Sequence, residues 1–174
     1  MARARREALL ARCGGVAATL LLAAAVGAAD LVTATLVAAV PAPNERTGLS
    51  FAVGLNLRRA FPVAIRRLLE LPECRALFDG LALDGDASLR RTLYYPPDAL
   101  GFEEPCRLGG NAFTAVGRVQ TGLCPRFAGL PVERAALVLI HEALHFAGLP
   151  ERPATPGAMT STEINDRIAE RCGL

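Results

Sequence analysis

The chain lacks lysine altogether, so all 19 of its basic residues are arginines. Together with the abundant alanine, this is typical of a GC-rich coding background, and a single arginine therefore says little about anion recognition. The chain also lacks a concentrated basic region. Residues 1–29 hold four arginines and one glutamate, a net charge of +3, whereas residues 30–174 hold fifteen arginines and sixteen acids, a net charge of −1. The near-neutral body argues against a nucleic-acid partner.

No uncharged apolar run near the N-terminus reaches the ~20 residues that a membrane-spanning helix needs. The run over residues 14–29 follows a basic stretch and ends in small residues, as in a secretory signal peptide cleaved near Ala28 or Ala29. A second apolar stretch, residues 31–40, leaves open an uncleaved anchor with Asp30 inside it, at a cost of ~2.5–3.5 kcal/mol. We therefore expect an exported protein, periplasmic or secreted. Either residues 1–29 are expected to be a signal peptide, or residues 1–40 are expected to be a membrane anchor. Membrane contact is expected only if this segment stays uncleaved.

The rest of the chain is expected to be a linker over residues 30–48 and a single domain over residues 49–174. Its cysteines lack the C-x-x-C spacing of structural zinc sites. Beyond the targeting segment there are four of them, an even number in an oxidising compartment: Cys74, Cys106, Cys124 and Cys172. This favours two disulfides over a metal site, with three pairings left open, and Cys172 is expected to fasten the last helix to the body.

Internal repeats and low-complexity tracts are also absent from the mature part. Apolar spacing predicts one or two short helices over residues 58–78, separated near Pro72. Two strands are predicted, one within residues 87–97 and one over residues 118–124, each followed by proline. The second strand precedes the strongest helical pattern and is a candidate edge strand for holding an extended peptide.

Both histidines of the chain lie in "LVLIHEALHFAGLPERP", within a helix predicted over residues 132–147. His141 and His145 are one helical turn apart, so their imidazoles share a face and can reach one point. Glu142 lies beside them, close enough to accept a proton from a water bound at that point. The H-E-x-x-H spacing therefore predicts two zinc ligands and a general base in an apolar helix where unpaired polar groups are costly.

A catalytic zinc needs a third protein ligand and an open position for water. Two glutamates compete for this role. Glu151 follows the turn that Gly148 permits, six residues after His145. Glu163 lies eighteen residues after His145 in "TSTEINDRIAERC", a second predicted helix with a cap at residues 160–162.

The segments "LIHEALHFAGLPERP" and "STEINDRIAERCG" resemble the zincin metallopeptidases, and especially the glutamate-zincins. They are also similar, over residues 112–173, to a group of small exported bacterial proteins with an H-E-x-x-H segment. The resemblance implies that the third ligand lies on the second helix, which favours Glu163 because a carboxylate on a helix is held firmly. It also implies that Asp166 orients one of the histidines. Glu151 is the alternative ligand.

The expected fold is α+β and zincin-like, with a small, mainly antiparallel sheet packed on the metal helix and a C-terminal helix carrying a ligand. The expected function is an exported zinc endopeptidase that hydrolyses peptides or proteins with Glu142 as base. Its oxyanion donor is sought among four side chains: Tyr94, Tyr95, Arg118 and Arg167. The alternatives are a non-catalytic, zinc-stabilised envelope module and a zinc amidohydrolase acting on a non-peptide amide. The oligomeric state is left open.

Overall fold

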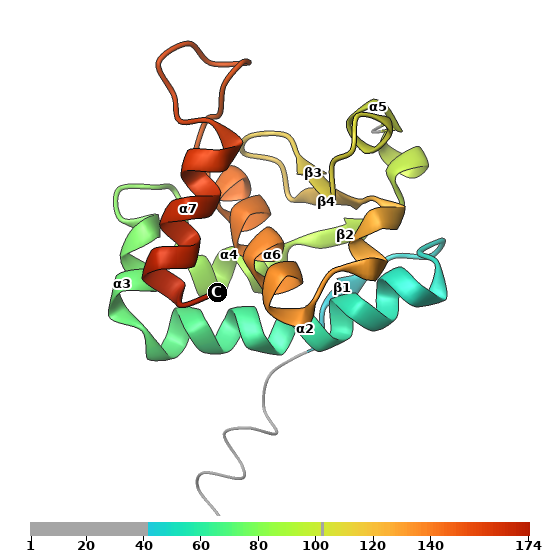
Figure 1. Ribbon diagram of the computed structural model, residues 1–174, viewed down its shortest axis with the longest axis horizontal. Coiled ribbons are helices and arrows are strands. Elements are labelled where there is room, and N and C mark those ends of the chain that lie inside the picture. Colours follow the sequence, from blue (N-terminus) through green and yellow to red (C-terminus); the bar gives the residue numbers. More distant parts are fainter. Residues whose placement is uncertain (1–41, 102) are drawn as a thin grey trace, which may run out of the picture. The chain divides into compact units, whose positions relative to one another are not determined.

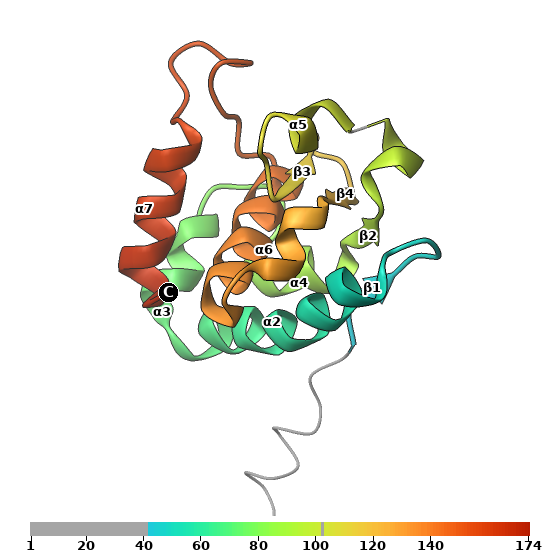
Figure 2. The ribbon, with the colours of Figure 1, turned by 45° about the vertical axis from the view of Figure 1, so that its right-hand side comes forward.

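Helix α6 lies at the centre of the fold, with helices α2, α4 and α7 and a small sheet packed around it (Figures 1 and 2). The computed structural model describes residues 42–101 and 103–174, so the predicted signal peptide or anchor lies outside the described residues. The helices are α2 Phe51–Glu70, α3 Pro72–Arg75, α4 Gly85–Arg91, α5 Glu103–Arg107, α6 Val132–Ala147 and α7 Ser161–Cys172. Short 3-10 helices are η1 Ala76–Phe78, η2 Pro97–Leu100 and η3 Pro125–Gly129.

The sheet has four strands in the order β1-β2-β4-β3: β1 Asn44–Glu45, β2 Leu93–Tyr95, β3 Ala112–Thr114 and β4 Gln120–Leu123. The β1–β2 and β2–β4 pairs are parallel, and only β3 and β4 are antiparallel. The α+β class is confirmed, but the expectation of a mainly antiparallel sheet is wrong. The cause is connection length, because β1, β2 and β4 are joined by long segments that contain helices, and parallel pairing needs such crossovers.

Strand β4 lies inside the sheet, between β2 and β3, so the predicted strand over residues 118–124 is not an edge strand. The strand at that edge is β3, which is joined to β4 by residues 115–119 in a hairpin. Within residues 87–97, only residues 93–95 form a strand, because α4 occupies the preceding residues. The strand that can be extended by another chain on this side is therefore β3.

Helix α2 is longer than the sequence pattern indicates, but it ends near Pro72 as predicted. The Ser50 side chain accepts a hydrogen bond from the Val53 amide at its start. The helix continues through Pro62, whose cost in a helix interior is ~3 kcal/mol. Burial of Leu57, Phe61, Ile65 and Leu68, each at most 1% exposed, contributes ~1.5–3 kcal/mol apiece and outweighs that cost.

Helix α6 has the bounds that the sequence predicts, and all its residues from Ala135 to Ala147 are buried. It ends at Gly148, whose φ of 111° lets the chain turn back sharply. The carbonyl of His145 accepts a hydrogen bond from the amide of Gly117 at 2.9 Å, which ties the β3–β4 turn to the last turn of the helix. The hairpin and the histidine-bearing turn are thus held together through the backbone.

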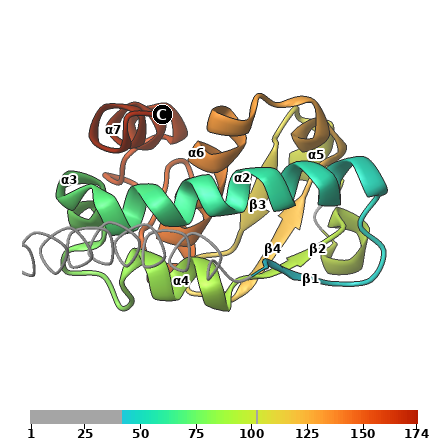
Figure 3. The same ribbon diagram turned by 90° about the horizontal axis from the view of Figure 1, so that it is seen from below.

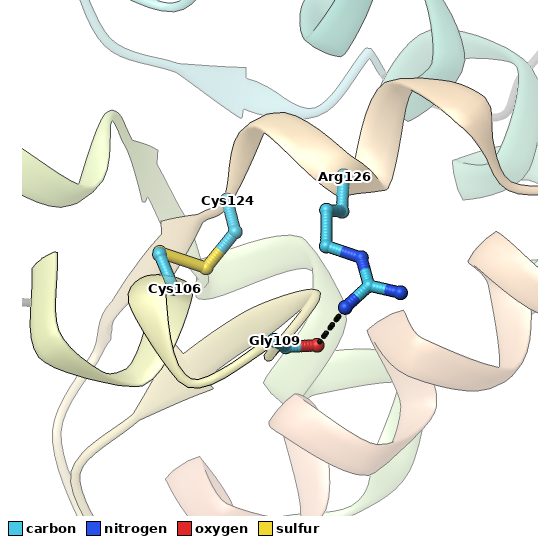
Figure 4. Close-up of a disulfide and its surroundings, with 4 residues drawn as sticks. All are labelled: Cys106, Gly109, Cys124 and Arg126. Atoms are coloured by element: carbon cyan, nitrogen blue, oxygen red, sulfur yellow. Dashed lines mark hydrogen bonds between the residues drawn. A yellow bond between two sulfur atoms is a disulfide. The ribbon is translucent and has the colours of Figure 1, made fainter.

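Two disulfides confirm the prediction made from the cysteine count and point to an oxidising, extracytoplasmic compartment. Cys74–Cys172 joins α3 to the end of α7, so Cys172 does fasten the last helix to the body. Cys106–Cys124 joins α5 to the end of β4 and encloses strand β3 (Figure 4).

In the described part of the chain, none of the helices is both long and apolar enough to cross a bilayer.

Candidate metal centre

The imidazoles of His141 and His145 lie on one face of α6, with ring centroids 4.7 Å apart. The Nδ1 atom of His145 donates to the carbonyl oxygen of Leu149 at 2.8 Å, and Nδ1 of His141 donates to Oδ1 of Asn165 at 3.0 Å. Because both partners are acceptors, each neutral ring carries its hydrogen on Nδ1. The two Nε2 atoms then present lone pairs to the same point, 3.0 Å from each other.

The carboxylate of Glu151 completes this arrangement. Its Oε2 lies 2.8 Å from Nε2 of His145 and 3.4 Å from Nε2 of His141. Tetrahedral zinc with bonds of ~2.0–2.1 Å places its ligand atoms about 3.3 Å apart, close to these three separations. Three acceptor atoms repel one another unless a cation or a proton lies between them, so the ligand set fits a metal ion. These three residues form the one group of candidate ligands found among the described residues.

His141 and Glu151 also shift each other's pKa. Burial lowers the pKa of His141, but its hydrogen bond to Glu151 and the charges of Glu142 and Glu151 outweigh burial, so the pKa lies above its usual value. The pKa of Glu151 is lowered by its hydrogen bond to His141 and by the charge that His141 and His145 carry when protonated, against a smaller effect of burial. Glu151 is therefore ionised at neutral pH, the form in which a carboxylate binds a metal.

Glu163, the expected third ligand, lies elsewhere. It occupies the third position of α7 and forms a capping box, in which its Oε2 accepts from the amide and hydroxyl of Thr160 at 2.6 and 2.8 Å. The same oxygen accepts from Arg152 at 2.9 Å, and the side chain is 54% exposed. These hydrogen bonds, led by that of the Thr160 amide, lower the pKa of Glu163 to about 2. The structure thus brings Glu151 to the histidines, whereas Glu163 stabilises the start of the helix.

Glu151 is held in place by its own loop. It forms an isolated bridge with Met159, and the amide of Arg152 donates to the Met159 carbonyl at 2.9 Å. The Arg152 guanidinium then reaches Glu163, which connects this loop to α7. Both ends of the loop over residues 151–160 are therefore anchored close to the metal group.

Asn165, and not Asp166, orients a histidine. Helix α7 buries Ile164, Ile168 and Cys172 against the body, and Asn165 lies at the border of that face, within reach of His141. Asp166 is about 100° further round the helix and is exposed. The resemblance implied that the carboxylate of Asp166 orients a histidine. In the structure, the side-chain amide of Asn165, one residue earlier, contacts His141 instead.

Glu142 is 5% exposed, and its Oε2 is a buried oxygen without a hydrogen-bond partner among the described residues. Burial raises the pKa of this carboxyl, while the charges of His141 and His145 and a hydrogen bond with the Thr114 hydroxyl lower it in part. The Thr114 hydroxyl also lies 2.6 Å from that of Thr121. Since a hydroxyl has one hydrogen, Thr121 donates to Thr114 when Thr114 donates to Glu142. A raised pKa beside candidate metal ligands is typical of a general base.

A cavity of about 460 Å³ opens in front of the metal group. Its walls are residues 112–116 from β3 and the following turn, the three residues of α6 that carry the motif, residues 151–155 and Ser161. The edge strand, the candidate ligands and Glu142 therefore share one space. Several wall residues are apolar, with Phe113 and Val116 at its outer side 36% and 50% exposed.

None of the four expected oxyanion donors lines this cavity. Tyr94 is fully buried, with its ring perpendicular to that of Phe61 and the two ring centroids 6.4 Å apart, and its hydroxyl lacks a partner among the described residues. Burial and the charge of Glu142 raise the pKa of Tyr94 well above its usual value. Arg167 lies on the wall of a second, smaller cavity. Sequence reasoning also missed Asn165, Thr114 and Arg152 as supports of the site.

The disulfide Cys106–Cys124 joins the two ends of the segment that contains residues 112–116 of the cavity wall. It links the segment before β3 to the residue after β4, and Arg126 donates to the Gly109 carbonyl at 3.1 Å beside it (Figure 4). The edge strand is thus enclosed in a covalent loop.

Comparison of the chain with family models, with curated proteins and with solved structures finds no match. The metal group and its cavity are therefore what argues for a function.

Proposed function

We propose that the protein is a zinc-dependent hydrolase that cleaves peptide bonds outside the cytoplasm. One observation carries the proposal: the ligand atoms of His141, His145 and Glu151 converge on the wall of a cavity that Glu142 also lines. A metal site that only stabilises a fold is usually closed by four protein ligands, whereas this group offers three beside an open space.

The donor set favours zinc over the other common divalent ions. Two imidazole nitrogens and one carboxylate oxygen suit a borderline metal, whereas magnesium and calcium require sets made largely of oxygen. When bound, zinc would supply a Lewis acid that polarises a carbonyl and brings the pKa of water to about 7. The hydrogen bonds from the two histidines to Leu149 and Asn165 hold both rings in the tautomer that such a metal needs.

Glu142 is the residue that moves the proton in this proposal. Its carboxylate accepts the proton of the attacking water and delivers it to the leaving amine. Burial raises the pKa of Glu142 above its usual value, which makes the carboxylate a stronger base. Thr114 lies on the sheet side of the same cavity, and Oε2 of Glu142 has no hydrogen-bond partner among the described residues.

An extended peptide is the substrate class that fits the cavity. Strand β3 forms the edge of the sheet along one wall, and an edge strand can pair with an added strand through main-chain hydrogen bonds. Residues 151–155 form another part of the wall, with Glu151 at its inner end. A peptide running along β3 would then pass in front of the metal group.

The test is hydrolysis by the oxidised, zinc-loaded protein and its Glu142→Gln variant, with casein and a mixed peptide pool as substrates. Glu142→Gln keeps the size of the side chain and removes its basicity, so turnover should fall ~10²–10⁴-fold while zinc stays bound at one equivalent. Glu133→Gln is the matched control, because Glu133 is an exposed acid in the first turn of the same helix.

Two results would contradict the proposal. If the zinc-loaded wild type releases no amine from casein or the peptide pool, the site is a structural or binding module, or it acts on another amide, such as a cell-wall linkage. If Glu142→Gln hydrolyses peptides as fast as Glu133→Gln does, hydrolysis does not occur at this site.

A further inference from the structure

The outward face of α2 carries an apolar stripe that the proposed hydrolase site does not use. Six large apolar side chains are exposed in the described part of the chain, and three of them lie on α2: Phe51, Leu55 and Leu69, at 78%, 42% and 50%. Arg59, Pro62 and Arg66 lie between them at intervals of three or four residues, so all six side chains share one face. Over eighteen residues the stripe is ~27 Å long.

The opposite face of α2 is the one that packs on the body, including Leu57, Phe61 and Ile65. Viewed from below, α2 crosses the near side of the molecule along its whole length (Figure 3). Scattered exposed apolar residues are ordinary, but residues aligned on one helix face mark a surface of interaction. We call the six residues 51, 55, 59, 62, 66 and 69 the α2 stripe.

The charge of α2 restricts what this surface can contact. The helix contains four arginines and a single acid, Glu70, a net charge of +3 by count. Arg58 is paired with Glu45 at 2.7 Å, but Arg59 and Arg66 lie within the stripe, which contains no acid. A second copy docking by the same face would bring like charges together, which disfavours self-association. An apolar and basic face is complementary to an apolar and anionic surface, as a bilayer with anionic lipids presents.

The path of the chain supports the same partner. Strand β1 lies beside the first turns of α2, because Glu45 pairs with Arg58 and its Oε2 is 3.1 Å from the position of a Cβ on Gly54. In the sequence, only three residues separate β1 from the apolar stretch that ends at Val40. Four peptide units span at most ~14 Å. A bilayer that held that stretch would lie within this distance of the start of β1.

We propose that the α2 stripe is a peripheral binding surface for anionic lipid bilayers. Phe51, Leu55 and Leu69 enter the interfacial region, and Arg59 and Arg66 contact lipid phosphates. Since α2 is amphipathic and packs on the body by its other face, it lies in the plane of the bilayer and does not cross it. This inference is independent of the metal centre.

The absence of tryptophan provides a direct test. F51W and L69W each introduce a single fluorophore into the stripe, and L108W introduces one at a side chain that is 79% exposed outside α2. The full chain is reconstituted with vesicles of phosphatidylcholine and phosphatidylglycerol at 3:1. Emission of F51W and L69W should shift to the blue and be quenched by lipids brominated on the acyl chain. Emission of L108W should stay red and be quenched by aqueous iodide.

The arginines are tested in the F51W background. Replacing Arg59 with glutamine should lower the ratio of lipid-contacting to lipid-free protein about fivefold, the effect of one arginine at an anionic surface. Arg134→Gln, an exposed arginine in the first turn of α6, is the matched control and should leave quenching unchanged. Vesicles of pure phosphatidylcholine should quench F51W less than the anionic vesicles do.

Three outcomes would overturn the inference. F51W and L108W could be equally accessible to iodide with vesicles present, which would mean that the stripe faces water. F51W could be blue-shifted without lipid in a particle of twice the monomer mass, which would identify a second copy as the occupant. A blue shift without lipid in a monomer would mean that the chain's own N-terminal segment covers the stripe. Unchanged circular dichroism of each variant confirms folding.

Discussion

Replacing Glu151 tests the composition of the metal group most directly. Its Oε2 lies 2.8 and 3.4 Å from the two histidine nitrogens, so it is one of the three candidate ligands. Structural zinc sites with four ligands bind with ~10–16 kcal/mol, or roughly 2.5–4 kcal/mol per ligand. Glu151→Gln should therefore weaken zinc binding by ~10²-fold or more.

The same substitution at Glu163 should have a small effect. Its carboxylate contacts Thr160 and Arg152, and it reaches the metal group only through the Arg152 backbone and the loop. Exposed ion pairs are weak, so zinc affinity should fall less than about tenfold. Glu170→Gln removes the same charge from an exposed position of α7 and serves as the control.

The assay is competition between the oxidised protein and a chromophoric zinc chelator at pH 7.5, with a thermal melt of each metal-free variant to confirm folding. The expected order of affinity is wild type, Glu170→Gln, Glu163→Gln and then, far below, Glu151→Gln. If Glu163→Gln lost zinc while Glu151→Gln retained it, the third ligand would be on α7 and the reasoning from the capping box would fail.

Three further predictions concern the supports of the site. The pKa of Glu163 is lowered to about 2, so the carboxylate's contribution to stability is fully present above its unfolded pKa near 4.5 and is lost as pH falls toward 2. The melting temperatures of wild type and Glu163→Gln should therefore differ at pH 6 and converge at pH 2. A constant difference between them would contradict the capping role. Asn165→Ala should lower zinc affinity ~10–100-fold with no comparable loss in Asp166→Ala, and equal losses in the competition assay would refute the assignment. Replacing Cys106 and Cys124 by alanine opens a loop of 18 residues and should cost about 3 kcal/mol in urea denaturation, and an unchanged midpoint would show that β3 does not depend on the bond.

Local patterns predict the parts of this fold that are held by local interactions. Helix α6 begins and ends where apolar spacing, Pro131 and Gly148 place its ends, because these signals act within one or two helical turns. The sheet could not be predicted in the same way. Its strands contain two to four residues, and their pairing depends on connections that contain helices. Alternation along such short strands carries no information about which neighbour is parallel.

The candidate site shows the same division. His141, Glu142 and His145 are brought together by one helical turn, so their spacing alone is sufficient. The third ligand depends on the course of the chain after Gly148, and both glutamates are compatible with the motif. One signal was nevertheless present, because Thr160 and Glu163 have the spacing of a capping box, which assigns that carboxylate to the backbone. Similarly, Ile164, Ile168 and Cys172 mark the inner face of α7 and place Asn165 nearer to it than Asp166.

The Cys74–Cys172 bond has a consequence for proteolysis. Residues 152–157 are all exposed and lie between Glu151 and α7, so this segment is the most accessible place for a protease to cut. A single cut there would separate α7 from the chain in sequence but leave it attached through Cys172. The nicked protein should migrate as one species without reductant and release a C-terminal fragment of about twenty residues when reduced. Release of α7, and with it the loss of the hydrogen bond between His141 and Asn165, would then require both a cut in the chain and reduction of the disulfide.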